Sequence, residues 1–203
     1  MLKTNYYISN YCSIKNSEIQ LNGTCVFSED SKDLTRFLKH YYTSKQLSYP
    51  KFFKMDRLSK LAFTGSEIIL EQLAEGKEST ALVFSNKSAS LDTDIKHQKS
   101  IEDPTTMFAS PSIFVYTLPN IGMGEVSIRH KLHTENAFFV SSQLQEDLLH
   151  EYAESLLETE NCKQVLCAWV EVFENSYHGF FYLVSKNGTI AHTPPMIKEL
   201  YTT

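Results

Sequence analysis

Residues 137–146, AFFVSSQLQE, predict a short apolar strand that runs directly into a helix. Residues 137–141 have the composition of a buried strand, and apolar side chains at spacings of three and four predict a helix over 143–158. Ser142 and Gln145 fit the S-x-x-Q capping box, in which each side chain accepts from a free backbone N–H group. Such a junction often carries chemistry, because a helix N-terminus favours negative charge.

Further strands flank this junction on both sides. The apolar run STALVFS at 79–85 precedes it, and the runs QVLCAWVEVF at 164–173 and GFFYLVS at 179–185 follow it. Strands that alternate with helices are typical of a parallel sheet with helices on both faces. We therefore expect an α/β fold, with a three-layer α/β/α arrangement and a mostly parallel sheet, in a single domain over 1–203.

The remaining segments are assigned from their periodicity and turn residues. Alternating residues over 5–27, with a turn signal at Asn22-Gly23, predict one or two strands. The other expected elements are a helix capped by Ser31 with Leu34, Phe37, Leu38, Tyr41 and Tyr42 on its apolar face, a helix that follows Asp56 and ends at Gly76, a loop with at most one helical turn over 86–104, a strand or extended segment over 112–118, and a helix that begins at Asn120.

Composition and charge argue against several classes of function. The chain has 19 Lys and Arg against 24 Asp and Glu, a net charge of −5, and no cluster of basic residues, so it lacks the electrostatic footprint of a protein that binds nucleic acid or an anionic membrane. It shows no signal-peptide pattern and no membrane span, so we expect a cytoplasmic protein. The four cysteines have neither zinc nor disulfide spacing and are interpreted as reduced thiols.

Two polar groups have partial metal-site patterns. His130 and His133 lie near a predicted helix end, where interaction with the helix dipole is a simpler role than metal binding. Asp92-Thr93-Asp94 resembles the start of a calcium loop but lacks its Gly and terminal Glu, and is interpreted as a solvated loop. We therefore expect no metal site and no cofactor.

Cys167, Glu171 and His178 have the residue types of a Cys–His–acid triad. Cys167 and Glu171, however, are expected on one face of the same apolar strand, where they would be neighbours in the core. This group is therefore interpreted as structural.

Four segments of the sequence resemble the N-terminal half of β-ketoacyl synthases: FFKMDRLSKLA (52–62), ALVFSNKSASLDTD (81–94), PSIFVYTLPNIGMGEVSIRHKL (111–132) and AFFVSSQ (137–143). More narrowly, they are similar to the short ketosynthase-like proteins that accompany bacterial fatty-acid-like and aryl-polyene or flexirubin-type pigment assembly lines. The resemblance covers about residues 50–185. It implies a thiolase-like fold, in which the N-terminal half supplies a nucleophilic cysteine at the strand-to-helix junction.

By this resemblance the position of the cysteine falls on Gln143, which follows Ser142. A glutamine there is also similar to the chain-length-factor partners of type II polyketide ketosynthases, which are non-catalytic members of heterodimers. The family's second half, which brings the catalytic histidines, is not expected in a chain that ends at Thr203. The resemblance therefore implies no catalytic residue, and an accessory subunit in acyl carrier protein-dependent fatty-acid or polyketide-type biosynthesis.

The family also places the strand before the nucleophile at a twofold axis. This implies a homodimer, or a heterodimer with a ketosynthase, that works with an acyl carrier protein. The implied dimer interface consists of Ala137, Phe138, Phe139, Val140 and Ser141. The resemblance further implies that Asp56 caps a core helix and that Arg57 packs or forms an ion pair.

Two other classes of function remain open from the sequence. A 3-oxoacyl-(acyl carrier protein) synthase-related enzyme or an acyl-thioester hydrolase using Ser142 or Cys167 would need a histidine within hydrogen-bond reach of the nucleophile. An acyl-binding module would instead need a deep apolar pocket that ends near Gln143.

Overall fold

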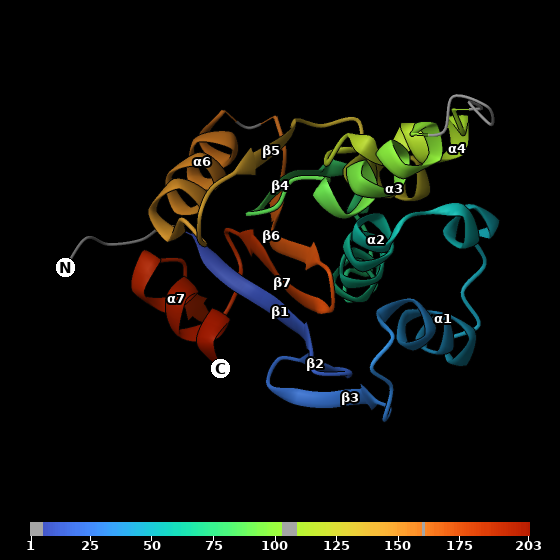
Figure 1. The fold of residues 1–203 in the computed structure, drawn as a ribbon. Coiled ribbons are helices and arrows are strands. Elements are labelled where there is room, and N and C mark those ends of the chain that lie inside the picture. The colour runs from blue at the N-terminus through green and yellow to red at the C-terminus, as the bar shows by residue number, and fades with distance from the viewer. Residues whose placement is uncertain (1–5, 103–108, 160) are drawn as a thin grey trace.

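The computed structural model describes residues 6–102, 109–159 and 161–203, and in them eight strands form one sheet (Figure 1). The strand order is β3-β2-β1-β7-β6-β4-β5, and β8 pairs with β1. The strands are β1 (Tyr7–Lys15), β2 (Glu18–Leu21), β3 (Thr24–Ser28), β4 (Thr80–Asn86), β5 (Asn136–Val140), β6 (Gln164–Phe173), β7 (Ser176–Ser185) and β8 (Ile190–Ala191).

Seven α-helices accompany the sheet in the described residues. None of these helices combines the length and the apolar character that a membrane-spanning helix requires. The helices are α1 (Leu34–Ser44), α2 (Arg57–Leu70), α3 (Leu91–Ile101), α4 (Pro111–Phe114), α5 (Ile121–His130), α6 (Glu146–Glu158) and α7 (Pro194–Thr202), with short 3-10 turns at Pro50–Lys54, Lys77–Ser79 and Val115–Thr117.

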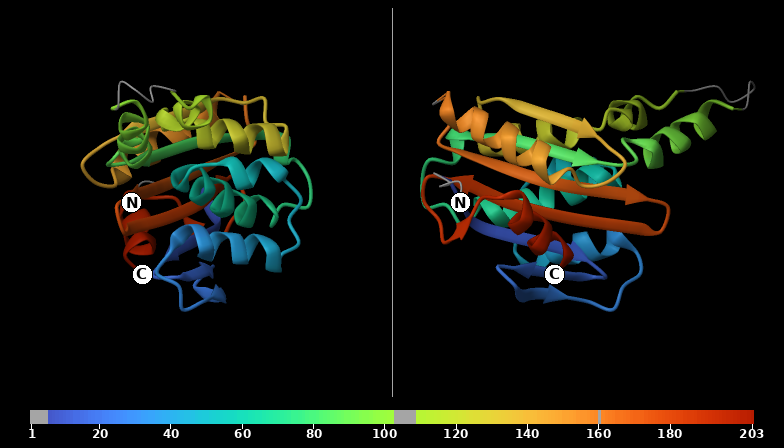
Figure 2. Two further views of the ribbon diagram at one scale, coloured as in Figure 1. Left: turned by 45° about the vertical axis from the view of Figure 1, so that its right-hand side comes forward. Right: turned by 90° about the vertical axis from the view of Figure 1, so that its left-hand side faces the viewer.

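Helices cover both faces of the sheet, which confirms the predicted α/β class and its three layers (Figure 2). Strand β6 contributes side chains to two hydrophobic cores, because successive side chains of a strand point to opposite faces of the sheet. Leu166 and Ala168 pack in the core beneath α1, α2 and α5, whereas Val165 and Trp169 pack in the core beneath α6 and α7.

The direction of the strands differs from the prediction of a mostly parallel sheet. Among the strands of the described residues, only β4–β5 and β4–β6 are parallel pairs, and the other strand pairs are antiparallel. The reason lies in the connections. Two residues join β1 to β2, β2 to β3 and β6 to β7, and a two-residue turn can link only antiparallel neighbours. Asn22 and Gly23, the predicted turn, have positive φ angles of 51° and 77°, as such a tight hairpin turn requires.

Two segments without clear periodicity also differ from the sequence prediction. The segment 86–104, expected to be a loop with at most one helical turn, contains the 11-residue helix α3, and its residues 103–104 lie outside the described part. Helix α3 was missed because Thr93 is its only buried residue, so it shows no apolar stripe. Of the segment 112–118, expected to be a strand or extended, residues 112–117 lie in α4 and the following 3-10 turn after Pro111, a residue suited to the first turn of a helix, and Leu118 alone has an extended backbone.

The structure confirms one predicted helix N-cap and contradicts another. The Asp56 carboxylate accepts from the backbone N–H of Ser59 at 2.8 Å, which confirms Asp56 as the N-cap of α2. Helix α1 buries all five predicted apolar residues, but its cap is Asp33, two residues after Ser31. Helix α2 ends at Leu70, well before Gly76.

Gly65 allows α2 to lie directly against the sheet. A Cβ atom at this position would clash with the ring of Phe181, a buried residue of β7. A Cβ atom added at Gly122 of α5 would similarly lie 3.1 Å from the Ala62 Cβ of α2, whereas a Cβ at Gly124 would meet nothing within 4 Å. The missing side chains of Gly65 and Gly122 are therefore used for close packing.

Gly65→Ala is expected to lower the free energy of unfolding by about 3 kcal/mol, because the buried Phe181 ring must move to admit one methyl group. Gly124→Ala is the matched control: it adds the same methyl group to a helix in open space and is expected to raise stability by up to about 1 kcal/mol. Urea unfolding of both variants measures the difference. Equal effects of the two substitutions would contradict the close packing of α2 on β7.

Candidate functional site

Strand β5, the predicted dimer interface, is the last strand at one edge of the sheet. It pairs in parallel with β4, and the Ser141 backbone N–H extends this pairing by donating to the Asn86 carbonyl at 2.9 Å. No other described strand lies on its outer side. The outward backbone groups of such an edge strand form a ready site for pairing with another chain.

The side chains of β5 leave this edge uncovered. Phe138 packs against the core on the α2 face, and Phe139 packs on the α6 face, where its ring meets the Tyr152 ring edge-on at 5.2 Å. Val140, at the end of the strand, is 57% exposed. The strand is thus fixed on both faces while its outer edge and its last apolar side chain remain accessible.

Gln143 lies in a short loop between β5 and α6, not in the first turn of the helix. Helix α6 begins at Glu146 and its N-cap is Gln145, which makes no side-chain capping bond, so the predicted capping box of Ser142 is wrong. The Ser141 hydroxyl instead donates to the Gln143 carbonyl at 2.8 Å. This side-chain to backbone bond favours a turn over a helix, and it leaves Gln143 exposed two residues before the N-cap.

Cys167 does not have the environment of a nucleophile. The residue is fully buried, and burial raises the pKa of its thiol to about 12, so the thiol stays protonated at neutral pH. Cys167 lies opposite Tyr182, whereas Glu171 lies opposite His178. Four residues of strand separate the two pairs by about 13 Å. The structure therefore does not assemble the Cys–His–acid triad.

The described histidine contacts do not supply a base to Ser142. The histidines contact other residues instead: His40 contacts Glu29, His97 contacts the Phe114 ring, His130 contacts Glu67, His150 and His192 contact each other and Glu154, and His178 stacks on Tyr201. A hydrolase that uses Ser142 finds no support in these contacts.

A wide hollow of about 1030 Å³ lies away from Gln143, among the turns next to β1, β2 and β7. Polar residues such as Ser17, Glu29 and Asp30 line it. An acyl chain requires a predominantly apolar pocket, so this hollow does not have the character expected of an acyl-binding module.

Asp56 and Arg57, in the segment 52–62 that resembles β-ketoacyl synthases, have structural roles. Arg57 donates to the Asp92 carboxylate at 2.9 Å and to the Glu174 carbonyl at 2.7 Å, and the Thr93 hydroxyl donates to Asp56 at 2.7 Å. Arg57 therefore forms the predicted ion pair. Asp92-Thr93-Asp94, interpreted from the sequence as a solvated loop, is the first turn of α3 and docks it onto the start of α2.

His130 belongs to a buried charge cluster centred on Glu67 of α2. The Glu67 carboxylate accepts from Arg129 at 2.8 Å and lies 2.8 Å from the His130 imidazole, while His133 is exposed. Burial alone would raise the pKa of Glu67, but the hydrogen bonds from His130 and Arg129 outweigh it and lower the pKa to about 2. The cluster holds α5 against α2, and sequence reasoning missed it because Glu67 lies 62 residues before Arg129.

Comparison with known proteins finds similarity in structure rather than in sequence. No family model and no curated protein sequence matches the chain. A chain from the complex of the ketosynthase ApeO with its chain length factor ApeC, from Xenorhabdus doucetiae, is similar with a TM-score of 0.63 and 12% identity, over 98% of this chain and 91% of that one.

Three further structures are similar over about 90% of this chain. The ishigamide ketosynthase/chain length factor has a TM-score of 0.68 at 17% identity, and the ketosynthase AntDE in complex with the acyl carrier protein AntF has 0.66 at 11%. A β-ketoacyl synthase from Burkholderia phymatum has 0.60 at 10%. This chain spans 62%, 62% and 60% of those chains, respectively.

The chain therefore has a thiolase-like α/β fold. More narrowly, the fold is that of ketosynthases and chain length factors, as the sequence resemblance implied. Identities of 10–17% establish the fold alone.

Proposed function

We propose that this chain is a non-catalytic, ketosynthase-like subunit that pairs through β5 with a ketosynthase or with a second copy of itself. It would act as a single domain in acyl carrier protein-dependent fatty-acid or polyketide-type biosynthesis in the cytoplasm. The observation that carries the proposal is the exposed Gln143 directly after an open edge strand. This junction joins the two features of an accessory subunit, namely a position without a nucleophile and a surface that can pair.

The chemistry of the junction supports the non-catalytic part. A ketosynthase forms a covalent thioester, for which it needs an ionised thiol. Gln143 offers an uncharged amide, and the nearest buried thiol to the junction in sequence, Cys162, has a pKa raised by burial. The contacts of the histidines favour neither the hydrolase nor the synthase-related alternative.

The comparisons support the pairing part. Two of the similar structures are described as a ketosynthase with a chain length factor, and a third is a ketosynthase in complex with an acyl carrier protein. This chain covers 91% of the matched chain in the Xenorhabdus complex. A chain of similar length is therefore one component of a two-component assembly. An open edge strand is suited to such an assembly.

Gln143→Cys tests whether the junction is catalytic. The substitution is expected to give a thiol that iodoacetamide alkylates, but no β-ketoacyl product from acyl and malonyl carrier proteins when the purified chain is assayed alone. A thiol in the first turn of a helix would have a pKa below the usual 8.5, but position 143 lies two residues before the N-cap, and the dipole effect is confined to the first turn. Its alkylation rate should therefore match that of the exposed Cys25, which serves as an internal control.

Peptide mass spectrometry follows alkylation at both positions in the same sample. Product formation by the wild type, or by Gln143→Cys without any added ketosynthase, would overturn the non-catalytic proposal. A thiol at 143 that reacts at least about tenfold faster than Cys25 would indicate an activated site and would also count against it.

A further inference from the structure

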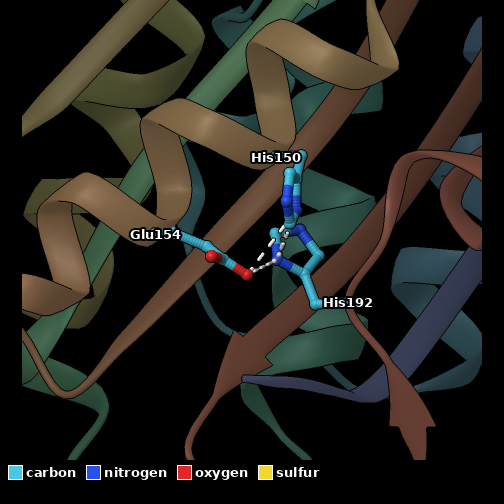
Figure 3. A group of neighbouring side chains, drawn as sticks. All are labelled: His150, Glu154 and His192. Atoms are coloured by element: carbon cyan, nitrogen blue, oxygen red, sulfur yellow. Dashed lines mark hydrogen bonds and ion pairs between the residues drawn. The ribbon is translucent and has the colours of Figure 1, made fainter. Parts of the chain in front are cut away.

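A cluster of three side chains joins helix α6 to the segment between β8 and α7 (Figure 3). His150 and Glu154 lie one turn apart on α6. The His192 Nδ1 atom lies 3.3 Å from the His150 Nδ1 atom and 3.3 Å from a carboxylate oxygen of Glu154, and the His150 Nδ1 atom lies 3.6 Å from that same oxygen. Three atoms that can each bind a metal ion thus form a nearly equilateral triangle.

The edges of this triangle have the length of a metal coordination polyhedron. An ion bound tetrahedrally through bonds of about 2.0–2.1 Å separates two of its ligand atoms by about 3.3–3.4 Å. A hydrogen bond between a charged imidazole and a carboxylate is shorter, about 2.7–2.9 Å. Two other histidine–glutamate contacts of this chain have the shorter length: His40 with Glu29 at 2.7 Å, and His130 with Glu67 at 2.8 Å.

Burial makes the cluster rigid on one side and open on the other. His192 is fully buried, and its backbone N–H donates to the Tyr6 carbonyl at 3.1 Å, which fixes its position next to β1. The His150 and Glu154 side chains are 23% and 24% exposed. An ion could therefore enter from the surface, and water could occupy the remaining coordination position.

We propose that His150, Glu154 and His192 bind one divalent transition-metal ion of the zinc type. Two imidazole nitrogens and one carboxylate oxygen suit zinc, whereas calcium and magnesium prefer oxygen ligands alone. The bound ion would link α6 to the segment between β8 and α7 and so stabilise their contact. Sequence analysis predicted no metal site, because only the His150–Glu154 spacing is visible there and His192 follows 38 residues after Glu154. The proposal is independent of the function proposed for β5 and Gln143.

Zinc titration of the full chain, freed of purification tags and stripped with a chelator, tests the site. Isothermal titration is expected to show one zinc ion per chain, and cobalt substitution should give the visible absorption of a tetrahedral site. His150→Ala and Glu154→Gln should each weaken zinc binding more than about 100-fold, because a lost ligand costs more than the 10–100-fold of a lost outer partner. Both residues are partly exposed, so these variants are expected to fold, unlike a variant of the buried His192.

His40→Ala is the matched control, because it removes the histidine of an exposed histidine–glutamate pair elsewhere in the chain. It should bind zinc with the wild-type affinity. Zinc should also raise the melting temperature of the wild type and of His40→Ala, and should not raise that of His150→Ala. The proposal is overturned if the wild type binds no zinc at one equivalent, or if His150→Ala and Glu154→Gln bind it as tightly as the wild type.

Discussion

Val140→Asp is expected to convert the assembled protein into a monomer. In size-exclusion chromatography with light scattering, the wild type should have twice the chain mass of 23.3 kDa as a homodimer, or should co-purify from its native cells with one ketosynthase. Val140 ends the edge strand β5 and is 57% exposed in the single chain, so pairing along this edge would bury it. A carboxylate without a partner there should cost several kcal/mol and weaken association at least about 100-fold.

Ile128→Asp provides the matched control for this experiment. Ile128 is 59% exposed, but it lies on α5 rather than on the sheet edge, so the same charge should leave assembly unchanged. Phe139→Asp is less suitable, because Phe139 also packs on Tyr152 within the chain and its replacement would disturb folding. A wild type that is monomeric and recovers no ketosynthase, or an assembly that Val140→Asp leaves intact, would contradict pairing through β5.

The parts of the fold that the sequence predicted are those with strong local patterns. Helix α1 buries all five residues that its spacing indicated, and β4, β5 and β6 lie where the apolar runs placed them. The predicted strand direction was wrong, because β6 and β7 form a hairpin that turns at Glu174, a non-glycine residue with a positive φ of 52°. Only five residues, 174–178, separate the two predicted strands, which is too few for a parallel crossover, so the spacing itself indicates a hairpin.

The candidate site was predicted in part for a similar reason. The resemblance placed Gln143 after the β5 strand, and the structure has it there, on the surface. The start of α6 was set three residues too early, because the sequence pattern cannot show that the Ser141 hydroxyl bonds to the Gln143 carbonyl. Clusters assembled across long separations, such as His150 with His192, carry no local pattern and become visible only in the folded chain.

Glu67→Gln is expected to lower the free energy of unfolding at pH 7 by about 3–5 kcal/mol, the usual cost of removing one partner from a buried ion pair. The Glu67 side chain is 3% exposed, and its carboxylate holds both Arg129 and His130. Glutamine has the same size but no charge, so the guanidinium would lose its ion pair at the α2–α5 contact. Glu71→Gln is the control from the end of the same helix. The Glu71 side chain is 55% exposed and pairs with Lys77 at 2.7 Å, and such a surface pair contributes about 0–1 kcal/mol.

The pH dependence separates the loss of this charge from a general loss of packing. The pKa of Glu67 in the folded chain, about 2, lies below its ordinary value of 4.5. The ionised carboxylate therefore stabilises the fold fully above pH 4.5, and this contribution is lost as the pH falls from 4.5 towards 2. Urea unfolding at pH 7, 4.5 and 3 should show the wild type losing stability more steeply than Glu67→Gln below pH 4.5, so that the two converge in acid. Parallel curves for the wild type and Glu67→Gln would mean that the Glu67 charge does not hold α5 against α2.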